Sequence, residues 1–353
     1  MLIPYPLSIF TLAAPLLAGW AYVRLGGLSS PMVRVPIRVA VLALLCVVPV
    51  LTRGPGPVQM TLGLLTGYLA IRIVAVSGRW RADGGTGRRP TARQIARALV
   101  SVEDVMRPMP PRDPATSAGR AKTALVLGAI SAAACVALLV LGARIRLWEW
   151  SRYADALLVC LEVGIGVMGI NNLIIGFAAV HGRSVSGIQD RPMLSASLGE
   201  LWARRWNHLV ENNLARAFFV PLGRRGAPAL GMLAAFIASG VMHVMPVLAS
   251  APPALTLRPA AQVLGFFLLS GGLVLAERAA GLDPPARDLQ PGAVTLARVR
   301  TIVLFVVLTP LMLGPFADVT GVHGRSLRPP APAPAPAPWA GRDQNFKVRP
   351  AEP

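Results

Sequence analysis

The chain has 353 residues, of which 54% are hydrophobic and only 14% are charged, and its mean hydropathy is +0.56. Soluble domains carry about 25% charged residues, so this composition excludes a protein whose whole surface faces water. The formal net charge of +19 is compatible with a nucleic-acid partner, but no nucleic-acid-binding motif accompanies it, and we expect no nucleic acid among the partners.

Continuously apolar blocks of about 20 residues follow one another along the chain, and this is the length that crosses a hydrocarbon core of about 30 Å. Backbone polar groups at that depth must be paired internally, and the blocks do not alternate as barrel strands do, so they are predicted to be helices. The expected spans are 5–23, 36–52, 57–77, 121–143, 154–180, 227–250, 260–277 and 299–317. The predicted fold is an all-α, polytopic transmembrane bundle of about eight helices.

Arginine-rich loops determine the predicted orientation, because loops that carry more Lys and Arg stay on the cytoplasmic side. Most basic residues fall in a set of loops that includes 78–120 and 181–226, so we expect both segments to be cytoplasmic. Only Lys122 and Lys347 are lysines. Together with the abundance of Ala, Gly and Pro, this bias indicates a GC-rich genome, and we expect a bacterial inner-membrane protein.

Two segments are predicted to have no membrane-spanning helix. The basic loop 78–120 interrupts the membrane-embedded domain, which we expect to cover 1–324, and it contains a short helix near 91–106. The second segment is the tail 325–353. Its Ala-Pro repeat at 330–338 favours an extended, disordered chain.

The stretch 181–226 contains a candidate interfacial helix. Ser197 and Glu200 have the spacing of a capping box, which predicts that a helix begins at Leu198. The expected apolar arc consists of Leu198, Leu201, Trp202, Trp206, Leu209 and Val210. The opposite, polar arc consists of Glu200, Arg204, Asn207, His208 and Glu211. One interpretation is a helix at the membrane surface, with tryptophan anchors and a solvated polar face.

His243 lies inside the span 227–250. An ionisable residue at that depth is costly and is a functional hypothesis by default. A neutral imidazole tolerates burial better than a charge and is suited to proton transfer. Ser239, four residues earlier, shares the same helix face and is expected to hydrogen-bond the ring. The structural alternative is a histidine that bonds to a neighbouring helix.

Other polar residues inside the spans are weaker candidates. Asn171 and Asn172 are expected to hold helices together or to line a cavity. Arg72 requires a partner or a cavity, and the sequence does not identify either. Glu277, at the end of a span, is expected to pair with Arg278 or with a loop.

The remaining histidines and the cysteines give no sign of a metal centre. His181 and His323 lie at span edges or in loops, and a structural role is favoured for both. Cys46, Cys135 and Cys160 each lie in an apolar block, where free cysteine behaves as a small hydrophobe. We expect neither a disulfide framework nor a bound metal.

Three short motifs resemble the wax-synthase branch of the membrane-bound O-acyltransferases. They are the run from Ser197 to Asn207, the pair Pro221-Leu222, and the buried Ser239-Gly-Val-Met-His243. The match extends over roughly 195–245, and Leu201 and Ala203 depart from the Phe and Gly of the family pattern. This resemblance implies a multi-helix acyltransferase that uses acyl-CoA as co-substrate and needs no cofactor.

The resemblance also implies roles for individual residues. His243 would be the catalytic base, and Asn207 would orient the thioester or stabilise the developing oxyanion. Arg204 and Arg205 would bind the phosphates of coenzyme A, although ordinary positive-inside topology explains them equally well. The other expected substrate-binding residues are Trp202, Trp206 and Ser239. The expected acceptor is a lipophilic alcohol, which reaches the site from the membrane lipid.

Two other functions fit the same sequence. One is a membrane transporter or lipid-binding protein in which His243 belongs to a proton relay. The other is a non-acyl reaction, such as a cyclisation, in the same chamber. Transport would leave acyl-CoA intact, and cyclisation would add no acyl mass to the product.

Overall fold

The computed structural model describes residues 17–18, 21–22, 40–42, 56–82, 91, 93–96, 114–181, 187–250, 256–283 and 289–324. Within these ranges the fold is all-α. Six long helices carry most of it: α3 (Gly56–Ala82), α5 (Pro114–Ile145), α6 (Arg152–Val180), α10 (Pro228–Ser250), α11 (Leu257–Ala279) and α12 (Pro291–Thr320). All six are long and apolar enough to cross a membrane. The chain is therefore an integral, multi-pass membrane protein.

These six helices confirm six of the eight predicted spans. The spans predicted at 5–23 and 36–52 lie outside the described residues, apart from a few positions that are helical. The tail 325–353 also lies outside them. The basic loop is shorter than expected, because α3 continues to Ala82 and α5 already begins at Pro114. Inside that loop, residues 93–96 are helical. They belong to the short helix predicted near 91–106, most of which lies outside the described residues.

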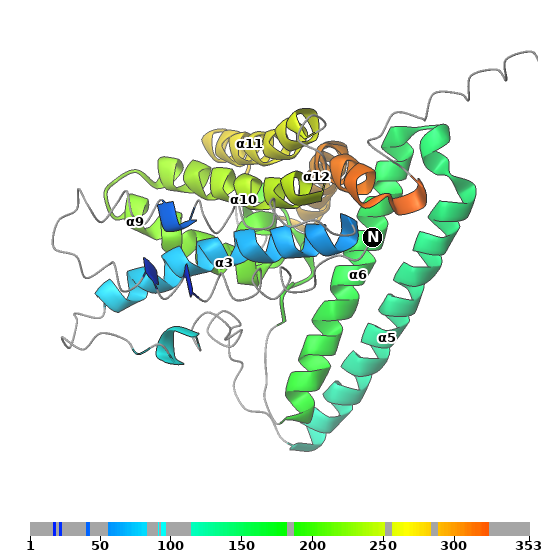
Figure 1. Cartoon of the computed structure of the whole chain (residues 1–353), viewed down its shortest axis with the longest axis horizontal. Helices are drawn as coiled ribbons and strands as arrows, with labels where there is room; N and C mark the ends of the chain where they lie inside the picture. Colours follow the sequence, from blue (N-terminus) through cyan, green and yellow to red (C-terminus); the bar gives the residue numbers. More distant parts are fainter. Residues whose placement is uncertain are drawn as a thin grey trace, which may run out of the picture.

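Two groups of helices make up the described structure. In the first group, α10 packs between α3 and α11, and the three helices run side by side (Figure 1). The second group is the antiparallel hairpin of α5 and α6, drawn in green at the right of Figure 1. α12 contacts α10, α11 and α6, and so joins the two groups.

Glycines allow the helices to approach one another closely. A Cβ atom added to Gly128 of α5 would lie 2.8 Å from the Leu173 side chain of α6, and one added to Gly176 would lie 2.7 Å from Leu125. At Gly63 of α3, an added Cβ would lie 2.9 Å from the backbone of Pro246 in α10. Without a hydrophobic driving force between helices in lipid, such close backbone contact supplies much of the packing energy.

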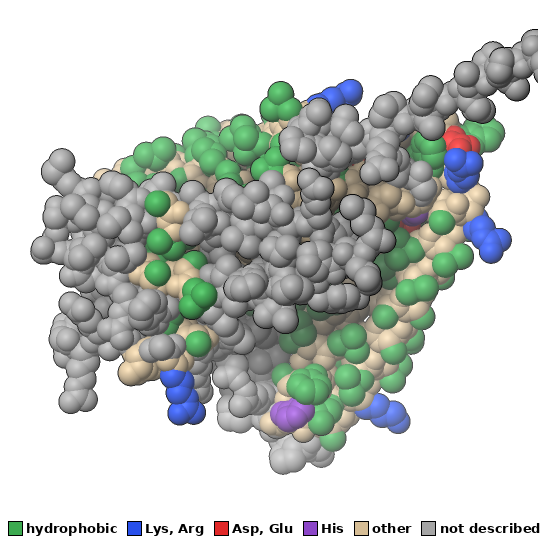
Figure 2. Space-filling view, in the orientation of Figure 1, with side chains coloured by type: hydrophobic (Ala, Val, Ile, Leu, Met, Phe, Trp, Pro, Cys, Tyr) green, Lys and Arg blue, Asp and Glu red, His purple; other side chains and the backbone are tan. Residues whose placement is uncertain are grey.

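The outward faces of the hairpin are apolar. Large hydrophobic side chains are exposed along both helices, among them Ile130, Val136 and Val140 of α5 and Leu161 and Phe177 of α6. Figure 2 shows green, hydrophobic side chains along the hairpin on this face of the molecule. Exposure of this extent is unfavourable in water and is expected where the surrounding solvent is lipid.

Polar residues inside the bundle have specific partners. Arg72 is 1% exposed, and its Nη1 donates a hydrogen bond of 3.2 Å to Oδ1 of Asn213, which supplies the partner that the sequence did not identify. Asn171 Oδ1 accepts hydrogen bonds from the backbone N–H groups of Ile188 and Gln189. Asn171 of α6 thus binds a non-helical segment, and the expectation that it joins two helices is not confirmed.

Glu277 joins α11 to α12. Its carboxylate accepts a hydrogen bond of 2.8 Å from the backbone N–H of Leu198 and forms an ion pair of 3.1 Å with Arg300. The expected contact with a loop is confirmed by Leu198, which lies in the segment 181–226. The alternative pairing with Arg278 is not formed, because Arg278 is directed to Asp283 at 3.4 Å. A neighbour in sequence on a helix points to a different face, whereas Arg300 faces Glu277 across the helix pair.

A buried histidine between two carboxylates connects the end of α12 to α6. His323 lies in the short helix η7 (Val322–Gly324), and its Nδ1 and Nε2 atoms are each 2.8 Å from an oxygen of Asp155 and Glu162, respectively. The three side chains are 0%, 0% and 3% exposed. The sequence interpretation placed His323 correctly near a span edge but did not identify Asp155 and Glu162. Their spacing of two helical turns on one face of α6 was the available signal.

Candidate active site

The segment that carries the first motif is a series of short helical pieces. Ser197 caps the first piece, α7 (Leu198–Glu200), by accepting a hydrogen bond from the Glu200 N–H, so the predicted start at Leu198 is confirmed. Next comes the π-helical turn η3 (Leu201–Arg205), closed by a bond of 2.8 Å from Trp206 N–H to the Leu201 carbonyl.

The predicted continuous amphipathic helix is wrong beyond this turn. The backbone leaves the helical conformation at Asn207 (φ −154°, ψ 89°), and a new helix, α8 (His208–Leu214), begins there with Asn207 as its cap. A break in the helix changes the direction of every following side chain. The apolar and polar arcs expected from a single helical period therefore do not form. His208, expected on the solvated arc, is 4% exposed.

A second π-helical turn follows α8. It is η4 (Ala215–Phe219), and the Val220 N–H bonds to the Ala215 carbonyl five residues back. The next helix, α9 (Val220–Gly223), contains Pro221. Proline has no N–H to donate to the preceding turn, which favours the wider hydrogen-bonding register just before it. Both π turns contribute side chains to one cavity, through Trp202 and Phe219.

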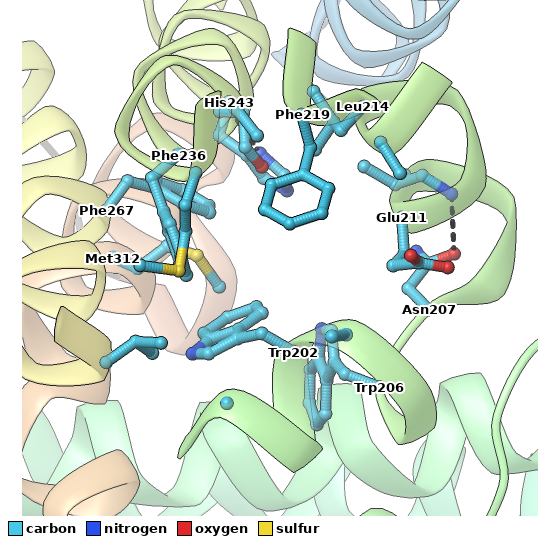
Figure 3. A pocket seen from close by; sticks show the side chains of 18 of the residues that line it. Trp202, Trp206, Asn207, Glu211, Leu214, Phe219, Phe236, His243, Phe267 and Met312 are labelled. Carbon is cyan, nitrogen blue, oxygen red and sulfur yellow. Dashed lines mark hydrogen bonds between the residues drawn. The ribbon is translucent and has the colours of Figure 1, made fainter. Parts of the chain in front are cut away.

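That cavity has a volume of about 230 Å³ and lies between the 198–219 segment and helices α10, α11 and α12. Figure 3 shows Trp202 and Trp206 on one side, His243 and Phe219 opposite them, and Asn207 with Glu211 on the wall formed by α8. Most of the lining is aromatic or aliphatic. The side chains in it that carry polar groups besides the two indoles are Asn207, Glu211, Ser239, His243 and Arg278.

Aromatic rings make the tryptophan wall rigid. The Trp202 ring lies about 6 Å, centroid to centroid, from the rings of Phe236, Phe266, Phe267 and Phe305. Trp206 packs on Phe305 at 5.0 Å. Tilted and edge-on contacts at such distances are favourable for aromatic pairs. The predicted substrate-binding tryptophans therefore form a fixed wall of the cavity.

The orientation of His243 is determined by its own helix. Nδ1 lies 2.8 Å from the backbone carbonyl oxygen of Ser239. A carbonyl can only accept, so Nδ1 carries the hydrogen, and in the neutral ring Nε2 is left with its lone pair. The ring also stacks at 4.7 Å on Phe267 and extends into the cavity beside Phe219 (Figure 3). His243 thus presents a hydrogen-bond acceptor, and a potential base, to whatever occupies the cavity.

The Ser239 hydroxyl is not what orients the histidine. The sequence suggested a hydrogen bond between the two residues, and the bond exists, but the Ser239 carbonyl accepts it. The Ser239 side chain lines the cavity instead, where its predicted role in substrate binding stays a prediction.

The amide of Asn207 is oriented by its role as a helix cap. Its Oδ1 accepts a hydrogen bond of 3.3 Å from the Val210 N–H, the dashed line of Figure 3. Because the oxygen is turned toward α8, the NH2 group is the other half of the side chain and is available as a donor at the cavity wall. A neutral donor in this position suits a developing negative charge.

The two predicted phosphate-binding arginines lie outside the cavity lining. Arg205 is held by Glu200, with an ion pair of 2.7 Å, and by the Asp190 carbonyl at 3.2 Å. Arg204 is exposed. The arginine that does line the cavity is Arg278, which sequence reasoning considered only as a partner for Glu277. Within the described ranges, no cluster of His, Cys, Asp or Glu is arranged to hold a metal.

Much of the segment that forms this cavity matches the model of a known protein family. Residues 186–269 match the model described as the membrane bound O-acyl transferase family. This segment is therefore similar to the membrane-bound O-acyltransferases. The residues matched to this acyltransferase family include all the predicted site residues, from Trp202 to His243.

Several curated relatives of the chain are named as alcohol or sterol O-acyltransferases. The chain is 34% identical over 127 residues to the probable long-chain-alcohol O-fatty-acyltransferase 2 of Arabidopsis thaliana, covering 33% of this chain and 36% of the relative. It is 28% identical over 173 residues to the probable long-chain-alcohol O-fatty-acyltransferase 1 of the same plant, covering 43% and 48%. It is 26% identical over 181 residues to the Arabidopsis acyl-CoA–sterol O-acyltransferase 1, covering 48% and 50%. The chain thus spans half or less of the length of these relatives.

Proposed function

We propose that this protein is an acyl-CoA-dependent O-acyltransferase that esterifies a hydrophobic alcohol inside the membrane. The observation that carries the proposal is the His243 geometry: Nδ1 is bound to the Ser239 carbonyl, and the ring lies in a cavity that Asn207 also lines. A base and a neutral donor on the walls of one apolar chamber are what acyl transfer from a thioester requires.

In the proposed reaction, His243 Nε2 takes the proton of the alcohol as its oxygen attacks the thioester carbonyl carbon. The NH2 group of Asn207 donates to the oxyanion of the tetrahedral intermediate. The intermediate then collapses, the C–S bond breaks, and the thiolate of coenzyme A leaves. The imidazolium returns its proton to that thiolate, so the products are an ester and free coenzyme A.

The walls of the cavity support an acyl chain and a lipophilic alcohol as substrates. Its aromatic and aliphatic walls suit an acyl chain and a lipophilic acceptor, both of which would arrive from the membrane lipid. The two arginine-rich loops give the orientation we propose, with 181–226 on the cytoplasmic face of a bacterial inner membrane, where acyl-CoA is available. The names of the relatives include both long-chain alcohols and a sterol as acceptors, so an alcohol of either shape is a reasonable first probe.

Membranes that contain the protein provide the test. Labelled acyl-CoA is supplied with a panel of lipophilic alcohols, and esters are identified by mass. We expect an ester and stoichiometric free coenzyme A, both reduced by about 10²–10⁴-fold in His243→Ala. Ester formation that survives this substitution unchanged would overturn the mechanism.

The same assay separates the two other functions considered for the sequence. A transporter or lipid-binding protein would leave acyl-CoA intact in sealed vesicles. A cyclase would change the acceptor without adding acyl mass. Either result, obtained with no ester, would replace the acyltransferase proposal.

A further inference from the structure

One arginine in the cavity lining has no part in the proposed reaction. Arg278 lies in the last turn of α11 and lines the chamber together with Phe267 and Val274 of the same helix. These residues follow one another at intervals of seven and four positions, which places them on one face of the helix. The cavity therefore extends along α11 to a charged end.

The end of a helix favours an arginine, but it does not favour this particular face. The dipole of α11 attracts a cation to its last turn, and a long side chain can reach the membrane surface from there. Both preferences would be met equally on the opposite face of the helix. The Arg278 side chain is 46% exposed, so its guanidinium is accessible at this end of the chamber.

Asp283 occupies only one edge of the Arg278 guanidinium. Its Oδ2 atom lies 3.4 Å from Nε, while its other oxygen accepts a hydrogen bond from the Ser197 hydroxyl. Among the residues that the structure describes, Nη1 and Nη2 of Arg278 have no hydrogen-bond partner. The end of the guanidinium, which carries two parallel N–H groups, is thus the edge that can bind an oxyanion.

The distance between His243 and Arg278 indicates which anion would lie at this edge. The His243 ring stacks at 4.7 Å on Phe267 (Figure 3), and Phe267 precedes Arg278 by eleven residues. At a rise of about 1.5 Å per residue, Phe267 and Arg278 are about 16 Å apart along α11. In coenzyme A about 13 bonds join the thioester sulfur to the first phosphorus, and an extended chain of that length covers about 14–16 Å. A thioester at His243 thus places this phosphate beside Arg278.

We propose that Arg278 binds the phosphate at the end of the pantetheine arm of acyl-CoA and thereby holds the thioester at the depth of His243. The inference rests on the proposed acyltransferase function and adds a residue that positions its acyl donor. Acyl transfer itself is unchanged, because the phosphate binds to the guanidinium and forms no covalent bond. A site at this distance requires a phosphate on the arm and does not require the nucleotide that follows it.

The test compares three acyl donors that carry the same acyl chain. They are acyl-CoA, acyl-phosphopantetheine, which keeps the phosphate and lacks the nucleotide, and acyl-pantetheine, which lacks both. Each is supplied with the same lipophilic alcohol, and the readout is the ratio of kcat/KM for acyl-phosphopantetheine to kcat/KM for acyl-pantetheine. A hydrogen bond between charged groups corresponds to a preference of about tenfold or more, and we expect a ratio of this size.

Variants of Arg278 assign the preference to this guanidinium. Arg278→Ala should lower the ratio by about tenfold or more. Arg278→Gln keeps a polar side chain but carries no charge, so it should also lower the ratio. The control is Arg144→Ala, since Arg144 is an exposed arginine in the last turn of α5 and lies outside the cavity lining. Its ratio should equal that of the unchanged protein.

The outcomes separate the role of Arg278 from the acyltransferase function. A ratio near one in the unchanged protein, or a ratio that both Arg278 variants leave intact, would overturn the role of Arg278 while the acyltransferase function stands. If no ester forms from any of the three donors, the proposed function fails, and the role of Arg278 fails with it. Melting in detergent verifies that each variant is folded, and if Arg278→Ala shows no unfolding transition, Arg278→Gln decides by the same ratio.

Discussion

His323 Nδ1 lies 2.8 Å from an oxygen of Asp155, although 168 residues separate them in the chain. Nε2 of the same ring is 2.8 Å from Glu162, so one histidine ties the end of α12 to two turns of α6. The backbone carbonyl of His323 also accepts a hydrogen bond from the Trp148 indole at 2.8 Å. Since α6 and α5 form a hairpin, this cluster holds the hairpin against the rest of the bundle.

Breaking the cluster should destabilise the protein strongly. His323→Ala removes the hydrogen-bond partner that two buried carboxylates share, and a buried group that loses its hydrogen bond costs about 1–3 kcal/mol, more where it is charged. We expect a clear fall in the thermal unfolding midpoint in detergent. Glu149→Ala is the control, because its pair with Arg146 is half-exposed and contributes about 0–1 kcal/mol. Equal midpoints for the two variants would contradict a stabilising role for His323.

Gly142 of α5 should tolerate no side chain. An added Cβ would overlap the His323 ring itself, which cannot move without losing a carboxylate. Gly142→Ala is therefore expected to lower the unfolding midpoint. Gly164→Ala, in the middle of α6, meets nothing within 4 Å and should be neutral or stabilising by up to about 1 kcal/mol, since alanine favours a helix. The same melting experiment compares the two.

His243 and Ser239 are joined by one hydrogen bond, but their side chains should contribute unequally to the reaction. His243→Ala should remove about 10²–10⁴-fold of the ester-forming rate. Ser239→Ala keeps the carbonyl that orients the ring, so we expect a loss of at most about tenfold, the value of one neutral hydrogen bond. Initial rates at saturating acyl-CoA give both numbers. Equal losses would show that the hydroxyl, and not the carbonyl, is the important partner.

Asn207 combines a helix cap with a proposed oxyanion donor, and two substitutions separate these roles. Asn207→Asp keeps a good cap but replaces the NH2 donor with oxygen, so kcat should fall by about 10²–10³-fold with little change in stability. Asn207→Ala removes both and should also lose about 1 kcal/mol of stability. If Asn207→Asp retains full kcat, with its folding verified by melting, Asn207 is only a cap.

The arginine pair of the first motif should respond unequally. Arg205→Ala leaves Glu200 without its ion pair and is expected to lower stability. Arg204, which is exposed, should leave stability unchanged when replaced by alanine. If Arg204 binds the phosphates of coenzyme A, Arg204→Ala raises KM for acyl-CoA and leaves KM for the alcohol unchanged. An unchanged KM for acyl-CoA would assign Arg204 to membrane topology alone.

The membrane character and the location of the site followed from local properties of the sequence. Apolar blocks about 20 residues long predict spanning helices because the bilayer thickness is constant, and six of the eight predicted spans correspond to helices of the structure. His243 was a candidate because an ionisable residue is expensive inside such a block. The start at Leu198 was also predictable, since a helix cap depends on residues only three positions apart.

Only the tertiary structure decided how these parts meet. The break at Asn207 turned one expected helix into two pieces, which moved Glu211 from a solvated face to the cavity wall. Glu277 forms its ion pair with Arg300 and not with its neighbour Arg278. His323 contacts two carboxylates that lie more than 160 residues away in the chain. Helical periodicity specifies which residues share a face within one helix. Which faces of different helices come together depends on close packing between segments distant in the chain, and no local pattern records that choice.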